Sequence, residues 1–315
     1  MHEVTALPAT PSAQASPDAV TMTQLPPTWR LRLGAYVSLM KPHVTVLLLG
    51  TTLAAMVVAA SGMPSFGLIV ATLLGGALAA GSANAINCYW DRDIDGLMTR
   101  TKTRALPAHR VDERHALAFG LALGAASFLL LALAVNLLSA LLAVAAILFY
   151  VVIYTMWLKR TTSQNIVIGG AAGAVPVLVG WAAVAGSLSL VPIWMFLVIY
   201  LWTPPHFWAL SLLLKNDYER AGVPMLPVVF GEEETYRQIV LYTLLLFAAT
   251  LMLFAIHAMG YLYLVAAVGL GAYLLRLTLR LRRERTLKLA RTVFWFSNYY
   301  LVLLFAAMVL DHVLH

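Results

Sequence analysis

Asn87, Asp91 and Asp95 recur at intervals of four residues at the end of a long apolar run. Four residues advance an α-helix by roughly 6 Å and turn it by about 40°, so these side chains lie along one face. A row of oxygen ligands suits Mg²⁺, which binds carboxylates together with the oxygens of a substrate phosphate. The cations needed to hold such a phosphate follow along the chain: Arg100, Lys102 and Arg104.

The alternative interpretation of this segment is a solvated helix end, where Asp and Arg commonly cluster. Asn87 favours a binding site, because solvation alone does not need a neutral oxygen at helical spacing. Asp93 is rotated about 200° from Asp91 on a helix. It is therefore expected to point away from the row and to pair with Arg92 or Arg100.

Composition predicts an all-α integral membrane protein. Of the 315 residues, 61% are hydrophobic and 11% charged, and the mean hydropathy is +0.83. A membrane helix needs roughly 20 apolar residues. Acids at the mouth of such a helix are costly and indicate function. We expect about nine spans, near residues 36–61, 65–90, 115–136, 138–158, 165–186, 190–214, 236–257, 259–281 and 289–312. The turn between the third and fourth rests on Asn136 and Ser139 alone.

Charge predicts the orientation of these spans. The loops near 61–65, 136–138, 186–190 and 257–260 contain no Lys, Arg, Asp or Glu, whereas the alternate loops and the N-terminal segment carry all 21 Lys and Arg. Under the positive-inside rule the N-terminus and the Asn/Asp row are cytoplasmic and the C-terminus is outside.

Residues 1–30 are rich in Ala, Pro, Ser and Thr and are expected to form a disordered tail, followed by a single membrane domain over 31–315. The net charge of +7 could suggest nucleic acid. No soluble basic domain accompanies it, so we expect the lipid bilayer and no nucleic acid as partner. The single cysteine, Cys88, excludes an internal disulfide.

The pattern Asn-x-x-x-Asp-x-x-x-Asp followed by Arg-Thr-x-x-Arg resembles the first signature of the intramembrane aromatic prenyltransferases, the UbiA superfamily. The string NCYWDRDIDGLMTRTKTRALP is more narrowly similar to the branch that farnesylates haem. Three further stretches carry the narrower resemblance: Leu-Lys-Arg at 158–160 with NIVIGGAAGAVPVLVGW at 165–181, LWTPPHFWAL at 201–210, and KNDYERAGVPMLPVV at 215–229.

This resemblance implies a UbiA-like helical bundle in a bacterial inner membrane. It implies transfer of a farnesyl group from farnesyl diphosphate to the vinyl group of haem B, giving haem O, with haem as substrate. Asn87, Asp91 and Asp95 would hold Mg²⁺, and a haem A synthase is an expected contact. The cations expected near the diphosphate are Arg100, Lys102, Arg104, Lys159, Arg160 and Lys215.

One departure from the superfamily concerns a second carboxylate motif. Quinone-forming members carry a second Asp-x-x-x-Asp in a later loop, where this chain offers Asp217, then Glu219, beside Lys215. The incomplete pair argues for the haem branch and leaves the number of metal ions open. Asp217 remains a candidate substrate contact.

Histidine and tyrosine side chains supply further candidates. His206 follows two prolines within an apolar span and is either a packing residue or a contact of the porphyrin, at a propionate or at the iron. His43 raises the same question more weakly. Tyr150 and Tyr154 share a helix face and are either part of an aromatic belt or stabilise an allylic cation.

Two rival functions are weighed against this one. Prenylation of a quinone precursor such as 4-hydroxybenzoate is disfavoured by the missing second carboxylate pair and by the Pro-His element. An ion-coupled transporter would place charges near the bilayer midplane and would show inverted repeats. The charges here crowd one interface, and no inverted repeat is visible.

Overall fold

The structure is a computed structural model that describes residues 29–314. Within that range nine helical segments are long and apolar enough to cross a membrane, which confirms the expected number. The spans are α2 (Pro42–Ala60), α3 (Phe66–Trp90), α5 (Glu113–Ala134), α6 to α7 (Leu137–Thr161), α8 (Asn165–Ala185), α9 (Leu190–Leu213), α12 (Gly231–Ala255), α13 (Tyr261–Glu284) and α14 (Leu287–Leu314). Shorter helices are α1 (Trp29–Leu39), α4 (Arg92–Leu97), α10 (Lys215–Arg220) and α11 (Leu226–Val229).

The first span begins later than expected, at Pro42 rather than near residue 36. Lys41 adopts a left-handed conformation with φ of 50°, and proline at the next position has no N–H to extend a preceding helix. The chain therefore breaks between α1 and α2. Residues 1–28 of the expected tail lie outside the described residues, and Trp29 begins α1.

The expected turn between the third and fourth spans is present at Asn136. Its side-chain oxygen accepts a hydrogen bond from the Ser139 backbone N–H at 2.8 Å, and so caps α6. Its Nδ2 atom donates to the Ala182 carbonyl of α8 at 2.7 Å. One asparagine thus starts a helix and joins it to a neighbour, because both ends of its amide are used.

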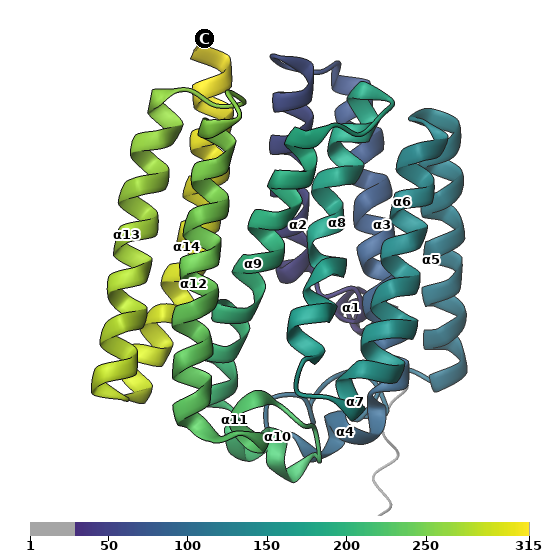
Figure 1. Ribbon diagram of the computed structural model, residues 1–315. Coiled ribbons are helices and arrows are strands. Elements are labelled where there is room, and N and C mark those ends of the chain that lie inside the picture. Colours follow the sequence, from purple (N-terminus) through teal and green to yellow (C-terminus); the bar gives the residue numbers. More distant parts are fainter. Residues whose placement is uncertain (1–28, 315) are drawn as a thin grey trace, which may run out of the picture.

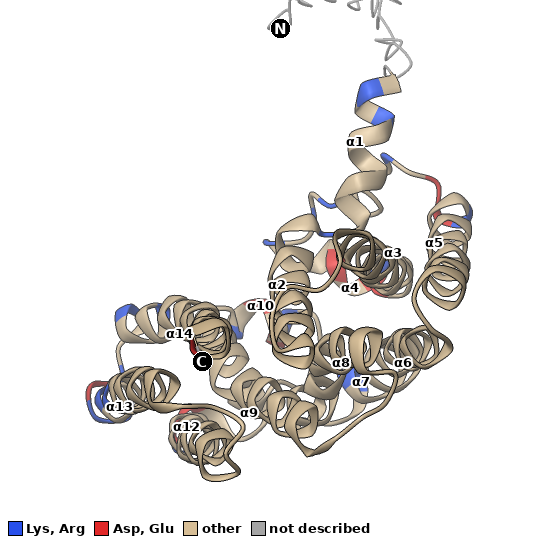
Figure 2. Ribbon diagram, turned by 90° about the horizontal axis from the view of Figure 1, so that it is seen from above, with Lys and Arg blue, Asp and Glu red and all other residues tan. Residues whose placement is uncertain are grey.

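Seen from above in Figure 2, α9, α12, α13 and α14 form one group of spans and α2, α3, α5, α6 and α8 form a second, and the two groups meet where α8 packs against α9. The short helices α4, α10 and α11 gather at the lower end in Figure 1, and the C-terminus lies at the opposite end. Small residues permit close packing between spans. A Cβ at Gly180 of α8 would overlap the Thr52 backbone of α2, so glycine is required there.

The fourth span differs from the regular helix expected over 138–158. It is α-helical over α6 (Leu137–Leu148), becomes a π-helix, η1, over Phe149–Leu158, and ends in the short α7 (Lys159–Thr161). π-Helical segments are rare in proteins, and those that occur are often found at functional sites. This one carries Tyr150, Tyr154 and Thr155 toward the charged end of the bundle.

Candidate active site

The three members of the Asn/Asp row share one helical face across the junction of α3 and α4. The Asp91 N–H donates to the Asn87 carbonyl at 2.9 Å, and the Asp95 N–H to the Asp91 carbonyl at 2.8 Å. Helical hydrogen bonding therefore continues through the junction and keeps the side chains aligned. Asn87, Asp91 and Asp95 are 3%, 0% and 2% exposed.

Each carboxylate of the row is paired with a cationic side chain outside the row. Lys159 forms an ion pair and hydrogen bond with Asp91. Arg104 donates from Nη1 to both oxygens of Asp95, at 2.9 and 2.7 Å. Burial alone would lower the pKa of Arg104, but the Asp95 carboxylate outweighs burial and raises that pKa. A buried carboxylate needs such a partner, because an unpaired buried charge strongly destabilises the fold.

Asn87 is oriented by three neighbours. Its Oδ1 accepts a hydrogen bond from Lys41 Nζ at 2.8 Å, and its Nδ2 donates to Asp91 at 2.7 Å and to Thr155 of η1 at 3.1 Å. Because an ammonium group only donates, the amide oxygen must face Lys41. Burial lowers the pKa of Lys41.

Lys41 and Thr155 were not identified as site residues from the sequence. The available signal for Lys41 was a lysine directly before a proline at the start of an apolar span. Thr155 gave no signal, because a threonine in a membrane helix commonly bonds its own backbone. Only the packing of η1 against α3 brings its hydroxyl to Asn87.

Asp93 points away from the row, but its expected partners were wrong. Arg160, rather than Arg92 or Arg100, binds the Asp93 carboxylate at 2.7 and 2.8 Å. The Arg160 hydrogen bond lowers the pKa of Asp93 to about 2. Arg160 also approaches Asp91 at 3.7 Å, so it lies between the row and the exposed end of α4.

The remaining cation candidates are less engaged with the row. Arg100 and Lys102 are exposed. Lys215 pairs with Glu232 at the start of α12, at 2.9 Å. Asp217 contacts Thr99 of the neighbouring loop at 3.0 Å rather than any member of the row.

The two tyrosines of η1 contact each other, with ring centroids 5.3 Å apart. Tyr154 packs in a hydrophobic cluster with Ile94, Met98 and Tyr218, directly beside the charged residues. A Cβ at Gly169 of α8 would overlap its ring. The position of Tyr154 is therefore fixed by packing between the row and the bundle interior.

His206 is held between aromatic rings on α9 and α14. Its ring stacks on Trp202 with centroids 4.3 Å apart and on Phe294 at 4.7 Å. Its Nδ1 lies 2.7 Å from Ser297 Oγ, and that hydroxyl donates to the Phe294 carbonyl at 2.7 Å. Since the hydroxyl hydrogen is used, Nδ1 is assigned as the donor, and the lone pair of Nε2 has no hydrogen-bond partner within residues 29–314.

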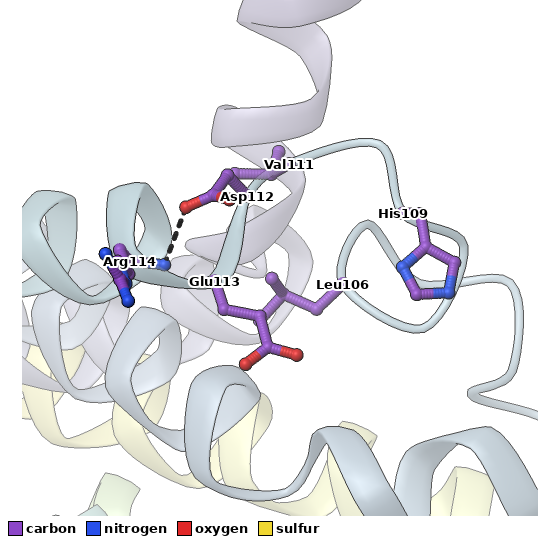
Figure 3. Close-up of a pocket in the computed structure, with 6 residues that line it drawn as sticks. All are labelled: Leu106, His109, Val111, Asp112, Glu113 and Arg114. Carbon is purple, nitrogen blue, oxygen red and sulfur yellow. Dashed lines mark hydrogen bonds between the residues drawn. The ribbon is translucent and has the colours of Figure 1, made fainter.

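Neither His43 nor the cavity in Figure 3 extends this site. His43 is exposed at the start of α2. The cavity lies where the loop after α4 meets α5, and none of the row residues line it. There the Asp112 carboxylate accepts the Arg114 N–H at 2.9 Å and caps α5. The residues drawn are Leu106, His109, Val111, Asp112, Glu113 and Arg114.

The row fits a magnesium ion that shares its coordination with a phosphorylated substrate. Within residues 29–314 no group of three His, Cys, Asp or Glu side chains could hold a metal. The row offers two carboxylates and an amide oxygen, a set that Mg²⁺ completes with phosphate oxygens. Asp91 Oδ1 is buried and makes no hydrogen bond to a described residue, with the Arg160 guanidinium 3.7 Å away as its ion-pair partner, so this oxygen can act as a metal ligand.

Comparison with known proteins agrees with this geometry. The UbiA prenyltransferase family matches residues 48–305. The protoheme IX farnesyltransferase of Symbiobacterium thermophilum is 55% identical, over 88% of this chain and 93% of its own. That of Gloeobacter violaceus is 54% identical, over 89% and 92%.

Solved structures share the fold at low sequence identity. A digeranylgeranylglyceryl phosphate synthase is 17% identical with a TM-score of 0.75, over 90% of this chain and 99% of that one. A UbiA homologue from Archaeoglobus fulgidus, bound to DMAPP and Mg²⁺, is 18% identical with a TM-score of 0.63, over 87% and 98%. These structures share the fold, whereas the two protoheme IX farnesyltransferases with more than half of their residues identical confirm the expected haem-farnesylating branch. The chain belongs to the UbiA prenyltransferase family, within its group of protoheme IX farnesyltransferases.

Proposed function

We propose that the protein transfers the farnesyl group of farnesyl diphosphate to the vinyl group of haem B, giving haem O, at the Asn87–Asp91–Asp95 row. The observation that carries this proposal is the pairing of each row member with a separate cation, at one end of a bundle that has nine candidate spans within residues 29–314. Acids and cations in one place can bind a metal and a diphosphate together.

Asn87, Asp91 and Asp95 would hold Mg²⁺, which when bound neutralises charge on the departing diphosphate. Lys41, Lys159 and Arg104 then exchange their present contacts for diphosphate oxygens. Their present hydrogen bonds and ion pairs already hold these cations beside the row before substrate arrives, so little reorganisation is needed as charge develops. Arg100, Lys102, Arg160 and Lys215 are more exposed and guide the diphosphate toward the row.

The transfer needs no protein nucleophile. The C1–O bond of farnesyl diphosphate breaks, and diphosphate leaves with the electron pair. The vinyl π electrons of haem B form the new C–C bond, and water adds to the resulting cation with loss of a proton. The rings of Tyr150 and Tyr154 stabilise the allylic cation by roughly 0.5–2 kcal/mol each, and the apolar spans exclude water until transfer is complete.

His206 is proposed as the haem contact, through the lone pair on Nε2. A histidine that binds a metal usually donates its other N–H to a fixed acceptor, and Ser297 supplies that acceptor. In His206→Ala the absorption spectrum of added haem B is expected to lose its bound form, and Ser297→Ala is expected to weaken binding several-fold. An unchanged spectrum in His206→Ala would remove this assignment.

The membrane arrangement is part of the proposal. The helices α4, which contains Asp95, α7 and α10 lie at the end of the bundle opposite the C-terminus, as Figure 1 shows. The basic surplus there supports an N-terminus and active site on the cytoplasmic face of a bacterial inner membrane. A contact with a haem A synthase stays a prediction, as does the single domain over 31–315.

The decisive experiment is an assay of purified protein in detergent with farnesyl diphosphate, Mg²⁺ and haem B. Haem O is the expected product. Absence of haem O while 4-hydroxybenzoate is prenylated would overturn the haem assignment.

Cysteines placed singly in the loops near 61–65 and 98–112, labelled from outside intact cells, test the orientation. Labelling of the cysteine in the loop near 98–112 alone would show that the orientation is the reverse of the one proposed.

A further inference from the structure

The first and second charged loops, defined here as residues 91–112 and 214–230, are joined by one buried carboxylate. Asp217 of α10 accepts hydrogen bonds from Thr99 Oγ1 at 3.0 Å and from Arg220 Nη2 at 3.2 Å. It is 8% exposed and lies 118 positions from Thr99 in the chain. A charged group is buried only where such partners replace its hydration.

The electrostatic surroundings of Asp217 come mostly from the first charged loop. Burial alone would raise the pKa of the Asp217 carboxyl. The Thr99 hydroxyl and the backbone N–H groups of Thr99 and Arg100 outweigh burial, with help from Arg220, and lower that pKa. The carboxylate therefore prefers its ionised form while it faces the Thr99–Arg100 turn.

The next residue of α10 contacts the same loop from a second direction. Tyr218 is 2% exposed and packs against Met98 and Ile94. Burial raises the pKa of its phenol, and the Arg100 and Arg104 guanidinium groups beside it oppose that rise. Asp217 and Tyr218 thus contact the turn that leads to Arg104, the partner of Asp95.

We propose that Asp217 is a positioning residue that latches the Thr99–Arg100 turn to α10, and so holds Arg104 in place beside the row. Its carboxylate is engaged by the chain itself, which argues against a role as ligand of a second metal ion. The consequence for catalysis rests on the proposed function. The contact of Asp217 with the Thr99–Arg100 turn, called the latch below, can be measured without substrate.

Limited digestion with trypsin tests the latch in the full-length protein in detergent. Trypsin cuts after Arg100, Lys102 and Arg104, and therefore reports opening of the first charged loop. Thr99→Val removes the hydroxyl, and cleavage there is expected to become about tenfold faster, because hydrogen bonds to charged groups are among the stronger ones. Thr99→Ser keeps the hydroxyl and is expected to digest like the wild type. Asp217→Ala also removes the acceptor of the Thr99 and Arg100 backbone N–H groups, so its cleavage should be at least as fast as that of Thr99→Val.

Two controls separate a local latch from general loosening. Cleavage within Arg282–Arg285, between α13 and α14, serves as the internal reference and should not change. Glu219→Gln alters an exposed neighbour in α10 and should also leave digestion unchanged. Wild-type cleavage rates in Thr99→Val, or equal acceleration at both loops, would overturn the proposal. So would Thr99→Ser digesting as fast as Thr99→Val.

The kinetic effect has its own signature. Asp217→Asn keeps one oxygen acceptor and is expected to raise KM for farnesyl diphosphate more than it lowers kcat. The Mg²⁺ concentration for half-maximal activity should stay unchanged, whereas a metal ligand would raise it. If the wild type forms no haem O at all, the proposed function fails, while the digestion pattern still decides the latch.

Discussion

The two charged loops use the same residue type for different work. In the first loop, the carboxylates of Asp91 and Asp95 are paired with cationic side chains, and one oxygen of Asp91 has no hydrogen-bond partner among the described residues. In the second loop, Asp217 is surrounded by donors from the Thr99–Arg100 turn. The difference teaches that a carboxylate's neighbours decide its role. The cations beside Asp91 and Asp95 can move to a bound substrate, which leaves these carboxylates available to a metal ion. The donors around Asp217 belong to the fold itself, so this carboxylate holds two loops together.

The largest expected effect comes from Asp91→Asn, which should lower kcat at least about 100-fold, because the charge that holds the metal is removed. Asp93→Asn is the matched control, since Asp93 is two positions away, more exposed, and paired with Arg160. Activity is measured as haem O formed per minute, and folding by gel filtration in detergent. Equal losses of kcat in both variants would show that Asp91 is no more important for catalysis than the exposed Asp93.

Metal dependence tests the comparison directly. Asp95→Asn is expected to raise the half-saturating Mg²⁺ concentration about tenfold or more, because a carboxylate ligand is lost. Asp217→Asn should leave that concentration within about twofold, since removing its charge weakens only a hydrogen-bonded anchor. A magnesium titration of initial rates checks both. A parallel rise in the two variants would make the second loop a metal site after all.

Lys41→Met probes the cation that the sequence did not reveal as a site residue. We expect KM for farnesyl diphosphate to rise about tenfold, which corresponds to one charge-assisted hydrogen bond. Lys288→Met makes the same change in charge at an exposed position in the first turn of α14 and should behave as wild type. If Lys41→Met also behaves as wild type, its contact with Asn87 is structural only.

The smallest effect expected concerns pH: the contact of Asp217 with the Thr99–Arg100 turn should not weaken between neutral and mildly acidic pH. Because the pKa of Asp217 is lowered below its ordinary value of 3.8, its contribution is fully present above that value and is lost only as pH falls through the lowered one. The ratio of trypsin cleavage in the first charged loop to cleavage within Arg282–Arg285 should stay constant between about pH 6 and 9. A ratio that rises on mild acidification would contradict an ionised anchor.

Some features were determined by the sequence alone because they depend on local geometry. The four-residue spacing of Asn87, Asp91 and Asp95 sets their common face through helix periodicity. The length of each apolar run sets the number of spans. Asn136 marked a turn because its side chain caps the helix that follows.

Other features were decided only by the tertiary structure, because they join residues that are distant in the chain. Lys41 reaches Asn87 across 46 positions, His206 reaches Ser297 across 91, and Asp217 reaches Thr99 across 118. Spacing rules describe neighbours on one helix and give no information about which helices pack together. For the same reason the partner of Asp93 was misassigned within its own loop, when the packing of the fourth span supplied Arg160 instead.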